Sequence, residues 1–262
     1  MLSVAIISKD EEERLPDCIK SVHFADDIIV IDSESTDRTV EIARNLEVRV
    51  ITEPWKGYAR QKQSAVDQCF FDWVLILDAD ERVPPATAEI IKNALIASAE
   101  EIDAFGFRRK NYLHGKWITH CGWYPDPVVR LVNRKTGSFV DRAVHERWIT
   151  KGIVKILDAD IEHISFRNYS EMIAKMQNYS TLAAKELFNH KKTVNFFSPV
   201  LHGTWMFFRT YFLELGFLDG FDGLMISTLN AGGSFLKYAK LKELIMTSED
   251  AYPPKKAQDT AY

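Results

Sequence analysis

A chain of 262 residues that is 46% hydrophobic and 27% charged can bury a sizeable core, as one large domain or as a domain with an appendage. The net charge of −4 argues against nucleic acid as a partner, and the three cysteines lack the spacing of a metal site. Scattered thiols suit a reducing compartment, and the first strand begins too early to leave room for a signal peptide, so a cytoplasmic location is expected.

Strand and helix patterns alternate along the first part of the chain. Apolar runs predict strands at residues 3–7, 28–31, 48–51 and 73–77, and the segments around them predict helices at 16–22, 37–46, 58–68 and 84–98. Ser35 or Thr36 is the expected N-cap of the second helix. Continuous apolar strands separated by helices predict a parallel sheet that is covered on both faces and has right-handed crossovers.

The pattern changes after Ala104. Strands are predicted at 104–109, 127–133 and 154–158 without a long helix between them, which indicates a mixed, partly antiparallel half of the sheet. Helices are predicted from Ser170, as N-cap, to residue 189 and from Ser198 to Gly216. We therefore expect an α/β domain over residues 1–165, a helical, aromatic-rich region over 166–246, and a disordered tail over 247–262.

Carboxylates follow the fourth predicted strand. The apolar run from Trp73 to Leu77 leads directly into Asp78, Ala79, Asp80 and Glu81. Open α/β sheets bind ligands outside the carboxyl ends of their strands, and Mg²⁺ is commonly held by one or two carboxylates together with substrate phosphates. The motif thus predicts a metal-held nucleotide diphosphate. The alternative is an acidic turn, because aspartate is common in turns for local backbone reasons.

Polar residues also follow the first two strands, and these segments carry a family resemblance. The segments VAIISKDEE (4–12), IVIDSESTD (29–37) and WVLILDADE (73–81) resemble glycosyltransferase family 2 enzymes of GT-A fold, over about residues 1–165. The segments WYPD (123–126), RLV (130–132) and VHE (144–146) resemble, more narrowly, the branch that contains lipopolysaccharide-core β-glycosyltransferases. The resemblance implies an α/β GT-A fold with a Rossmann-like nucleotide-binding half, a mixed sheet and a helical C-terminal appendage.

The resemblance also implies roles for single residues in binding a UDP-sugar and a divalent cation. Asp80 would be the main protein ligand of Mg²⁺ or Mn²⁺ on the diphosphate. Lys62 takes the place of a family arginine, and it departs from the pattern because lysine lacks the bidentate fork of arginine. The nucleotide would otherwise be held by Ser8 at the base pocket, Asp32 at the uracil edge, and Glu11 and Asp78 at the ribose.

Family 2 enzymes invert the anomeric centre, so a carboxylate must remove the proton of the acceptor hydroxyl. Asp126 is the first choice for this base, because the neighbouring Trp123 and Tyr124 offer an apolar setting that makes a carboxylate a stronger base. An Asp-Pro turn is the alternative role of Asp126, and Glu146 is the second choice of base. Acceptor contacts are expected from Trp123, Tyr124, Arg130 and His145, with a salt bridge as the alternative for Arg130 and a structural role for His145.

The second part of the chain contains a helical stripe of large apolar residues, which are Leu201, Trp205, Phe208, Phe212 and Leu215. The uncharged stretch around it is too short to span a membrane. Residues 166–246 carry 9 basic and 6 acidic residues, a net of +3, whereas residues 1–165 carry 22 and 28, a net of −6. Residues 194–246 could contact a membrane surface through their cations, pack on the catalytic domain, or form a homo-oligomer contact.

Together these observations predict a metal-dependent, inverting glycosyltransferase that moves a hexose from a UDP-sugar to a glycan or glycolipid acceptor, peripheral on the cytoplasmic membrane face. A sugar-1-phosphate nucleotidyltransferase is one alternative, but that family usually has a glycine-rich loop after the first strand, where this chain has SKDE (8–11). A haloacid-dehalogenase-type phosphatase normally carries its paired aspartates after the first strand. The alternative from another class is a non-catalytic, nucleotide-binding membrane or assembly module with the same fold.

Overall fold

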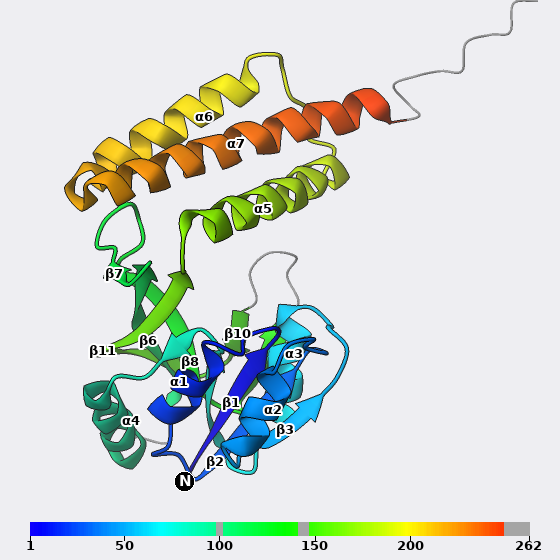
Figure 1. The fold of residues 1–262 in the computed structure, drawn as a ribbon. Helices are drawn as coiled ribbons and strands as arrows, with labels where there is room; N and C mark the ends of the chain where they lie inside the picture. The colour runs from blue at the N-terminus through cyan, green and yellow to red at the C-terminus, as the bar shows by residue number, and fades with distance from the viewer. Residues whose placement is uncertain (98–101, 141–146, 249–262) are drawn as a thin grey trace, which may run out of the picture. The chain divides into compact units, whose positions relative to one another are not determined.

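The structure is a computed structural model that describes residues 1–97, 102–140 and 147–248 (Figure 1). The described residues divide into two compact units. The first unit contains residues 1–119 and 123–165, and the second contains His120–Gly122 together with residues 166–248. Most of the tail that the sequence predicts to be disordered lies outside the described residues.

Strands and helices alternate through the first half of the first unit, as the sequence predicts. They are β1 (Leu2–Ser8), α1 (Leu15–Ser21), β2 (Asp27–Asp32), α2 (Thr39–Asn45), β3 (Arg49–Thr52), α3 (Tyr58–Asp67), β4 (Trp73–Asp78), β5 (Glu81–Arg82) and α4 (Pro85–Ala97). The strands β3, β2, β1 and β4 lie next to one another in that order, and each pair is parallel. The crossover helices that parallel strands require account for α1, α2 and α3.

The apolar run of β1 is continuous because both faces of the sheet are covered. Every residue of β1 is buried. Val4 and Ile6 belong to a core that also contains side chains of α1, whereas Ala5 and Ile7 belong to a second core that contains side chains of α3. Successive side chains of a strand point to opposite faces, so one strand supplies both cores. Each fully buried isoleucine contributes roughly 1.5–3 kcal/mol relative to an exposed one.

The strand register brings polar residues to one edge of the sheet. Ser8 pairs with Asp32 across β1 and β2, and Ile7 pairs with Asp78 across β1 and β4. The carboxyl ends of three neighbouring strands therefore meet at the edge where ligands bind in open α/β sheets.

The rest of the sheet contains antiparallel pairs. Its strands are β6 (Ile102–Leu113), β7 (Lys116–Trp117), β8 (Asp126–Asn133) and β11 (Ile153–Phe166), and β9 (Gly137–Val140) and β10 (Arg147–Thr150) form a separate pair. From β4 the order continues through β8, β6 and β11 to β5. The prediction of a mixed sheet is confirmed. The strands β6 and β11 are longer than the sequence predicts, at 12 and 14 residues.

The start of α2 differs from the prediction. The helix begins at Thr39, and the Oδ1 atom of Asp37 accepts a hydrogen bond of 3.0 Å from the backbone N–H of Thr39. The expected cap at Ser35 or Thr36 was wrong, because both residues bond to Asp10 in the loop after β1. Contacts between two loops thus engage Ser35 and Thr36 away from the helix start.

The second unit is helical and contains α5 (Tyr169–Asn189), α6 (Ser198–Phe208), the π-helical turn η1 (Arg209–Leu213), the 3-10 turn η2 (Gly216–Asp219) and α7 (Phe221–Thr247). The N-cap of α5 is Asn168, which accepts a hydrogen bond of 2.9 Å from the backbone N–H of Glu171, so the expected cap at Ser170 was wrong. None of the described helices has the combination of length and apolar character that a membrane crossing needs.

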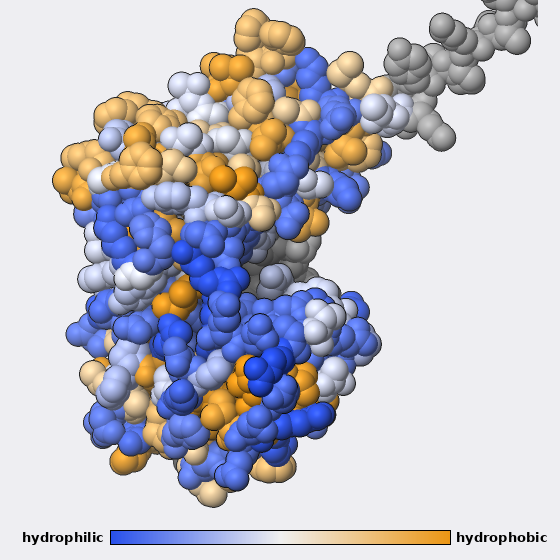
Figure 2. Space-filling view, in the orientation of Figure 1, coloured by the Kyte–Doolittle hydropathy of each residue, from blue (hydrophilic) through white to orange (hydrophobic). Residues whose placement is uncertain are grey.

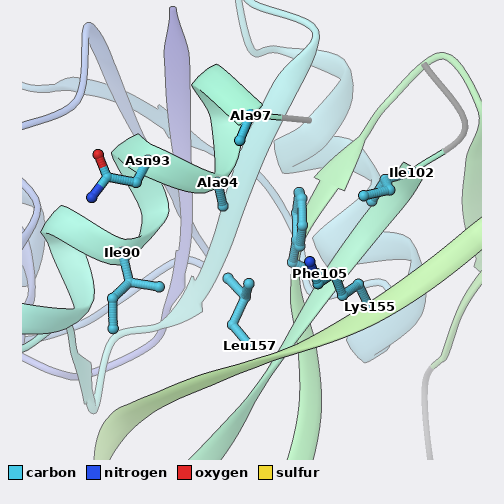
Figure 3. Close-up of a pocket in the computed structure, with 8 residues that line it drawn as sticks. All are labelled: Ile90, Asn93, Ala94, Ala97, Ile102, Phe105, Lys155 and Leu157. Carbon is cyan, nitrogen blue, oxygen red and sulfur yellow. The ribbon is translucent and has the colours of Figure 1, made fainter. Parts of the chain in front are cut away.

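One pocket of the first unit lies between α4 and the strands β6 and β11 (Figure 3). Its volume is about 300 Å³. The described residues that line it are mostly apolar and include no carboxylate: Ile90, Asn93, Ala94, Ala97, Ile102, Phe105, Lys155 and Leu157. The pocket therefore lacks the groups that would hold a metal or a ribose, and it contains none of the predicted site residues.

All three cysteines are buried thiols, which leads to a first testable prediction. Burial raises the pKa of Cys69 and of Cys121 to about 12, and burial, reinforced by nearby carboxylates, also raises the pKa of Cys18. Because the thiolate is the reactive form, we expect no thiol of the native protein to react rapidly with a disulfide reagent at pH 8. Titration with the same reagent in guanidinium should detect three reactive thiols. A rapidly reacting thiol in the native protein would contradict this assignment.

Candidate active site

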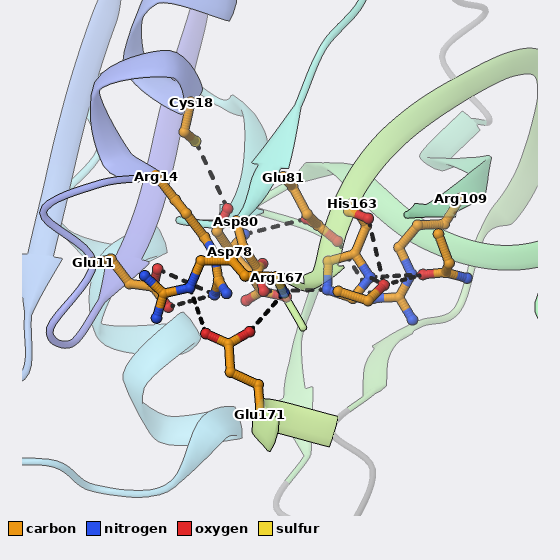
Figure 4. A network of polar contacts seen from close by, with 12 residues as sticks. Glu11, Arg14, Cys18, Asp78, Asp80, Glu81, Arg109, His163, Arg167 and Glu171 are labelled. Atoms are coloured by element: carbon orange, nitrogen blue, oxygen red, sulfur yellow. Dashed lines mark hydrogen bonds and ion pairs between the residues drawn. The ribbon is translucent and has the colours of Figure 1, made fainter. Parts of the chain in front are cut away.

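Glu81 lies at the centre of a charged network at the carboxyl end of β4 (Figure 4). Its Oε1 atom lies 2.6 Å from Nη2 of Arg130 and 3.4 Å from Nη1 of Arg109. Its Oε2 atom accepts a hydrogen bond of 3.2 Å from the backbone N–H of Asp78. The side chain is fully buried, and a buried carboxylate is tolerated only when it is paired and hydrogen-bonded. Glu81 therefore holds the turn that carries the two aspartates.

Asp78 is the second acid of this network. Its Oδ1 atom lies 2.9 Å from Nζ of Lys62, and its Oδ2 atom lies 2.8 Å from Nη2 of Arg130. Burial would raise the pKa of Asp78, but the ammonium of Lys62 and the guanidinium of Arg130 outweigh it and hold the pKa well below its ordinary value. Asp78 is thus a fixed negative charge at neutral pH.

Lys62 and Arg130 both form ion pairs with carboxylates of this network. The side chain of Lys62 is 1% exposed and faces Asp78, so its contact with a diphosphate stays a prediction. Arg130 was expected to contact the acceptor, with a salt bridge as the alternative. The structure contains the salt bridge, because Arg130 is buried between Asp78 and Glu81.

Asp126, the first choice of base, lies at the start of β8 in a polar setting. Its Oδ2 atom accepts hydrogen bonds from Nε and Nη2 of Arg109, at 2.9 and 2.7 Å, and lies 3.3 Å from Nδ2 of Asn111. The apolar setting that the sequence suggested was therefore wrong. The neighbouring rings of Trp123 and Tyr124 did not predict this polar setting, because Arg109 and Asn111 reach Asp126 from the neighbouring strand β6.

Asn111 connects Asp126 to His163, which was not predicted from the sequence. The Nδ2 group of Asn111 also donates to the backbone oxygen of Trp123 at 2.8 Å. Its Oδ1 atom lies 2.6 Å from Nδ1 of His163 and accepts a hydrogen bond of 3.1 Å from Ser165. Because Nδ2 faces two acceptors, this amide orientation is the one that satisfies the network, and it directs the Nδ1–H of His163 toward Asn111.

His163 faces Asp80, at a distance of 3.2 Å between Nε2 and Oδ2 (Figure 4). Backbone pairing holds the two residues together. The short strand β5 pairs with β11 so that Glu81 lies opposite His163, and the N–H of Ile164 donates to the backbone oxygen of Asp80 at 2.9 Å. The side chains of Asp80 and His163 are 17% and 12% exposed, so a small ligand can still reach them.

The predicted base pocket lies at the ends of β1 and β2. Asp32 is fully buried, and its carboxylate accepts hydrogen bonds from the backbone N–H of Ser35 at 2.9 Å, from the Ser35 hydroxyl and from the Ser8 hydroxyl at 3.4 Å. The structure thus brings Ser8 and Asp32 together as expected. A uracil contact to Asp32 would have to share an oxygen with Ser35, and it stays a prediction.

The predicted residues Glu11 and Tyr124 each have partners nearby. Glu11 follows β1, with its carboxylate 3.4 Å from Nη1 of Arg14. The ring of Tyr124 packs edge-to-face on Trp117, with 5.2 Å between ring centroids, and its hydroxyl donates to Asp160 at 3.2 Å. His145 and Glu146 lie outside the described residues, so their predicted roles are not tested.

The chain is similar in sequence to known proteins over most of its length. A sequence model of glycosyl transferase family 2 matches residues 3–157, which is more than half of the chain. The chain belongs to glycosyltransferase family 2. It is 32% identical to the lipopolysaccharide core biosynthesis glycosyltransferase LpsC of Rhizobium meliloti, over 92% of this chain and 91% of LpsC. It is 31% identical to the uncharacterized glycosyltransferase RT0209 of Rickettsia typhi, over 95% and 89% of the two chains.

The sheet of this glycosyltransferase is that of the GT-A fold, as predicted. Among solved structures, a glucosyl-3-phosphoglycerate synthase from Mycobacterium tuberculosis aligns with a TM-score of 0.36 and 23% identity, over 43% of this chain and 44% of that chain.

The donor set at Asp80 fits a divalent cation in this glycosyltransferase. A carboxylate and an imidazole face each other there, and the hydrogen bond from Nδ1 to Asn111 turns Nε2 of His163 toward the carboxylate, as at many metal-binding histidines. Among residues 1–97, 102–140 and 147–248, no cluster of three or more acidic, histidine or cysteine ligands forms a metal cage. A cation held here would take its other ligands from diphosphate and water, which suits Mg²⁺.

Three residues of this site were not predicted from the sequence, which are Arg109, Asn111 and His163. They lie on β6 and β11, far along the chain from Asp80. The only available signal was alternation, because Arg109 and Asn111 on β6, and His163 and Ser165 on β11, are spaced by two and so lie on one face of a strand. Polar residues repeating on one face of a strand in this way would have indicated a polar cluster.

Proposed function

We propose that this family 2 enzyme transfers a hexose from a UDP-sugar, with inversion, to a lipid-linked glycan such as a lipopolysaccharide core. We also propose that Asp80 and His163 hold a Mg²⁺ or Mn²⁺ ion on the diphosphate. The observation that carries the proposal is the pairing of Asp80 with His163 beside the ends of β1, β2 and β4. The similarity to LpsC, named for lipopolysaccharide core biosynthesis, supports the choice of acceptor.

The chemistry assigns different tasks to the residues of the site. The cation, when bound, stabilises the negative charge that develops on the departing UDP. Ser8, Glu11, Asp32 and Asp78 orient the nucleoside, as the family resemblance implies. Asp78 and Glu81 supply negative charge that keeps the Lys62, Arg130 and Arg109 cations fixed. A fixed arrangement of charges costs no reorganisation when the glycosidic bond breaks.

Asp126 is the proposed base. Within the described part of the chain, the hydrogen bonds to Asp126 all go to Oδ2, which leaves Oδ1 to accept the proton of an acceptor hydroxyl. The guanidinium of Arg109 lies 2.7 Å from Oδ2 and fixes the orientation of the carboxylate. In a single displacement, the acceptor oxygen forms a bond to the anomeric carbon, the bond to UDP breaks, and the proton passes to the carboxylate. Glu146 stays the second candidate.

The proposal is tested by measuring UDP release from a panel of UDP-hexoses, with a lipid-linked glycan acceptor and with Mg²⁺, Mn²⁺ or a chelator. We expect turnover with one donor and its loss on chelation. Release of pyrophosphate from a nucleoside triphosphate and a sugar 1-phosphate would identify a nucleotidyltransferase instead. UDP binding without turnover of any donor would favour a non-catalytic module.

Replacement of Asp126 by asparagine tests the base. We expect kcat to fall at least about a hundredfold, because general-base catalysis contributes 10²–10⁴-fold, while UDP binding is unchanged. The matched control is Asp158→Asn, since Asp158 also pairs with an arginine but its side chain is 90% exposed. Full activity of Asp126→Asn would exclude Asp126 as the base, and Glu146→Gln would then be expected to show the loss.

A further inference from the structure

The segments α6 and η1 bury small side chains and expose large apolar ones. On α6 and η1 the buried residues are Pro199, Gly203 and Thr210. A side chain at Gly203 would meet the backbone oxygen of Ala231 and the Cβ atom of Phe235 at 3.2 Å, so α6 and α7 are in close contact there. Helices that pack in water normally bury their large apolar residues, whereas close contact through small residues is typical of helices in a lipid environment.

The apolar stripe of α6 and η1 points outward. We call it the aromatic face, and it consists of Phe197, Leu201, Trp205, Phe208, Phe212 and Leu215. These side chains are between 43% and 64% exposed. The rings of Trp205 and Phe208 are 6.0 Å apart and those of Phe208 and Phe212 are 5.3 Å apart, so the face is continuous. Figure 2 shows apolar residues gathered on the surface of the helical unit.

Basic residues lie at the start of the aromatic face. Lys191 and Lys192 are exposed and precede α6 by a few residues. The Nζ atom of Lys242, on α7, lies 4.7 Å from the ring centroid of Phe196, so a third lysine reaches the same end. Residues 190–218 contain Lys191, Lys192 and Arg209 against Glu214 alone, a net of 3 − 1 = +2. This combination of a Trp- and Phe-rich apolar face with lysines beside it is typical of helices that lie in a membrane interface.

We propose that the aromatic face inserts into the boundary between headgroups and acyl chains of an anionic lipid bilayer, with Lys191, Lys192 and Lys242 at the headgroups. A large apolar surface exposed to water needs an occupant. The positive charge beside it selects an anionic lipid surface, and the absence of a spanning helix among the described residues fits insertion from one side. The inference adds a lipid surface to the proposed function, but its readout is lipid binding and not turnover, so either can fail alone.

The test uses the full chain and vesicles of phosphatidylglycerol and phosphatidylethanolamine in a sedimentation assay. We expect the parent protein to sediment with these vesicles, and the variant Leu201→Gln/Trp205→Gln/Phe208→Gln to bind at least tenfold more weakly. All three side chains are exposed, so the variant should fold, which circular dichroism and thermal unfolding will check. The matched control is Phe70→Gln/Ile96→Gln/Ile153→Gln, which removes three exposed apolar side chains from the first unit and should bind like the parent.

Two further variants separate charge from insertion. Lys191→Gln/Lys192→Gln should weaken binding roughly fivefold per lysine on anionic vesicles and have little effect on phosphatidylcholine vesicles. Lipids brominated on the acyl chains should quench the fluorescence of the parent, and Trp205→Phe should bind equally but lose most of the quenching.

Several outcomes would overturn the proposal. One is a parent protein that stays in the supernatant, and another is an aromatic-face variant that sediments as the parent does. A third is a parent that is dimeric by analytical ultracentrifugation, in which the triple variant dissociates the dimer and leaves vesicle binding unchanged. The aromatic face would then belong to a second copy of the chain.

Discussion

Asp80→Asn is expected to lower kcat for glycosyl transfer by about a thousandfold or more. A Lewis acid contributes several kcal/mol of charge stabilisation in the transition state, and about 4 kcal/mol corresponds to a thousandfold in rate. Asparagine keeps the size of the side chain but removes the charge that attracts the cation. His163→Gln should act in the same direction, because the imidazole faces the same carboxylate oxygen at 3.2 Å.

The decisive measurement for Asp80 is calorimetric binding of UDP with and without Mn²⁺. In the parent we expect Mn²⁺ to strengthen UDP binding. In Asp80→Asn this increment should disappear, while binding of UDP in the presence of a chelator stays as in the parent. Asp67→Asn is the matched control, since Asp67 lies on the exposed side of α3 and accepts a hydrogen bond from Gln63. An equal metal increment in Asp80→Asn would exclude Asp80 as the main ligand.

Glu81→Gln is expected to reduce the free energy of unfolding by about 3–5 kcal/mol, the range measured when one partner of a buried ion pair is removed. The cause is specific to this position. Glutamine accepts hydrogen bonds through one oxygen instead of two and carries no charge, so the buried Arg130 and the half-buried Arg109 would keep their charges with less compensation. The turn with Asp78 and Asp80 should also become less well ordered, and UDP binding should weaken.

The measurement is denaturation by urea, followed by fluorescence and by circular dichroism. Glu89→Gln is the control, because Glu89 is 67% exposed and pairs with Lys92 on the surface of α4. An exposed pair of this kind contributes at most about 1 kcal/mol. A loss of less than about 1 kcal/mol in the free energy of unfolding of Glu81→Gln would show that the network is not needed for stability. Its role would then be confined to the geometry of the turn.

The strands of the first half were predictable because each is a continuous apolar run between polar segments. The same property explains why Asp32 and Asp78 could be placed at one edge, since parallel strands end together. Helix starts were less predictable, because Ser35 and Thr36 contact Asp10 in another loop instead of capping α2. A local rule fails when a partner distant in the sequence competes for the same group.

The site itself was only half predictable. His163 lies 83 residues after Asp80, and a single histidine on a strand gives no pattern that relates it to an acidic turn. The helical stripe from Leu201 to Leu215 illustrates a different limit. Its period predicted one apolar face, but periodicity alone could not predict whether that face points to the core or away from it, because both give the same spacing.

The pairing of β5 with β11 makes the proposed metal site a matter of strand register. His163 faces Asp80 only because Glu81 pairs with His163 and Arg82 with Glu162. A slip of one residue in β11 would turn His163 and Ser165 to the opposite face and bring Glu162 and Ile164 in their place. Insertions and deletions are therefore tolerable in the loops around this sheet but not within the last residues of β11. There, one added or removed residue would change which side chain faces Asp80.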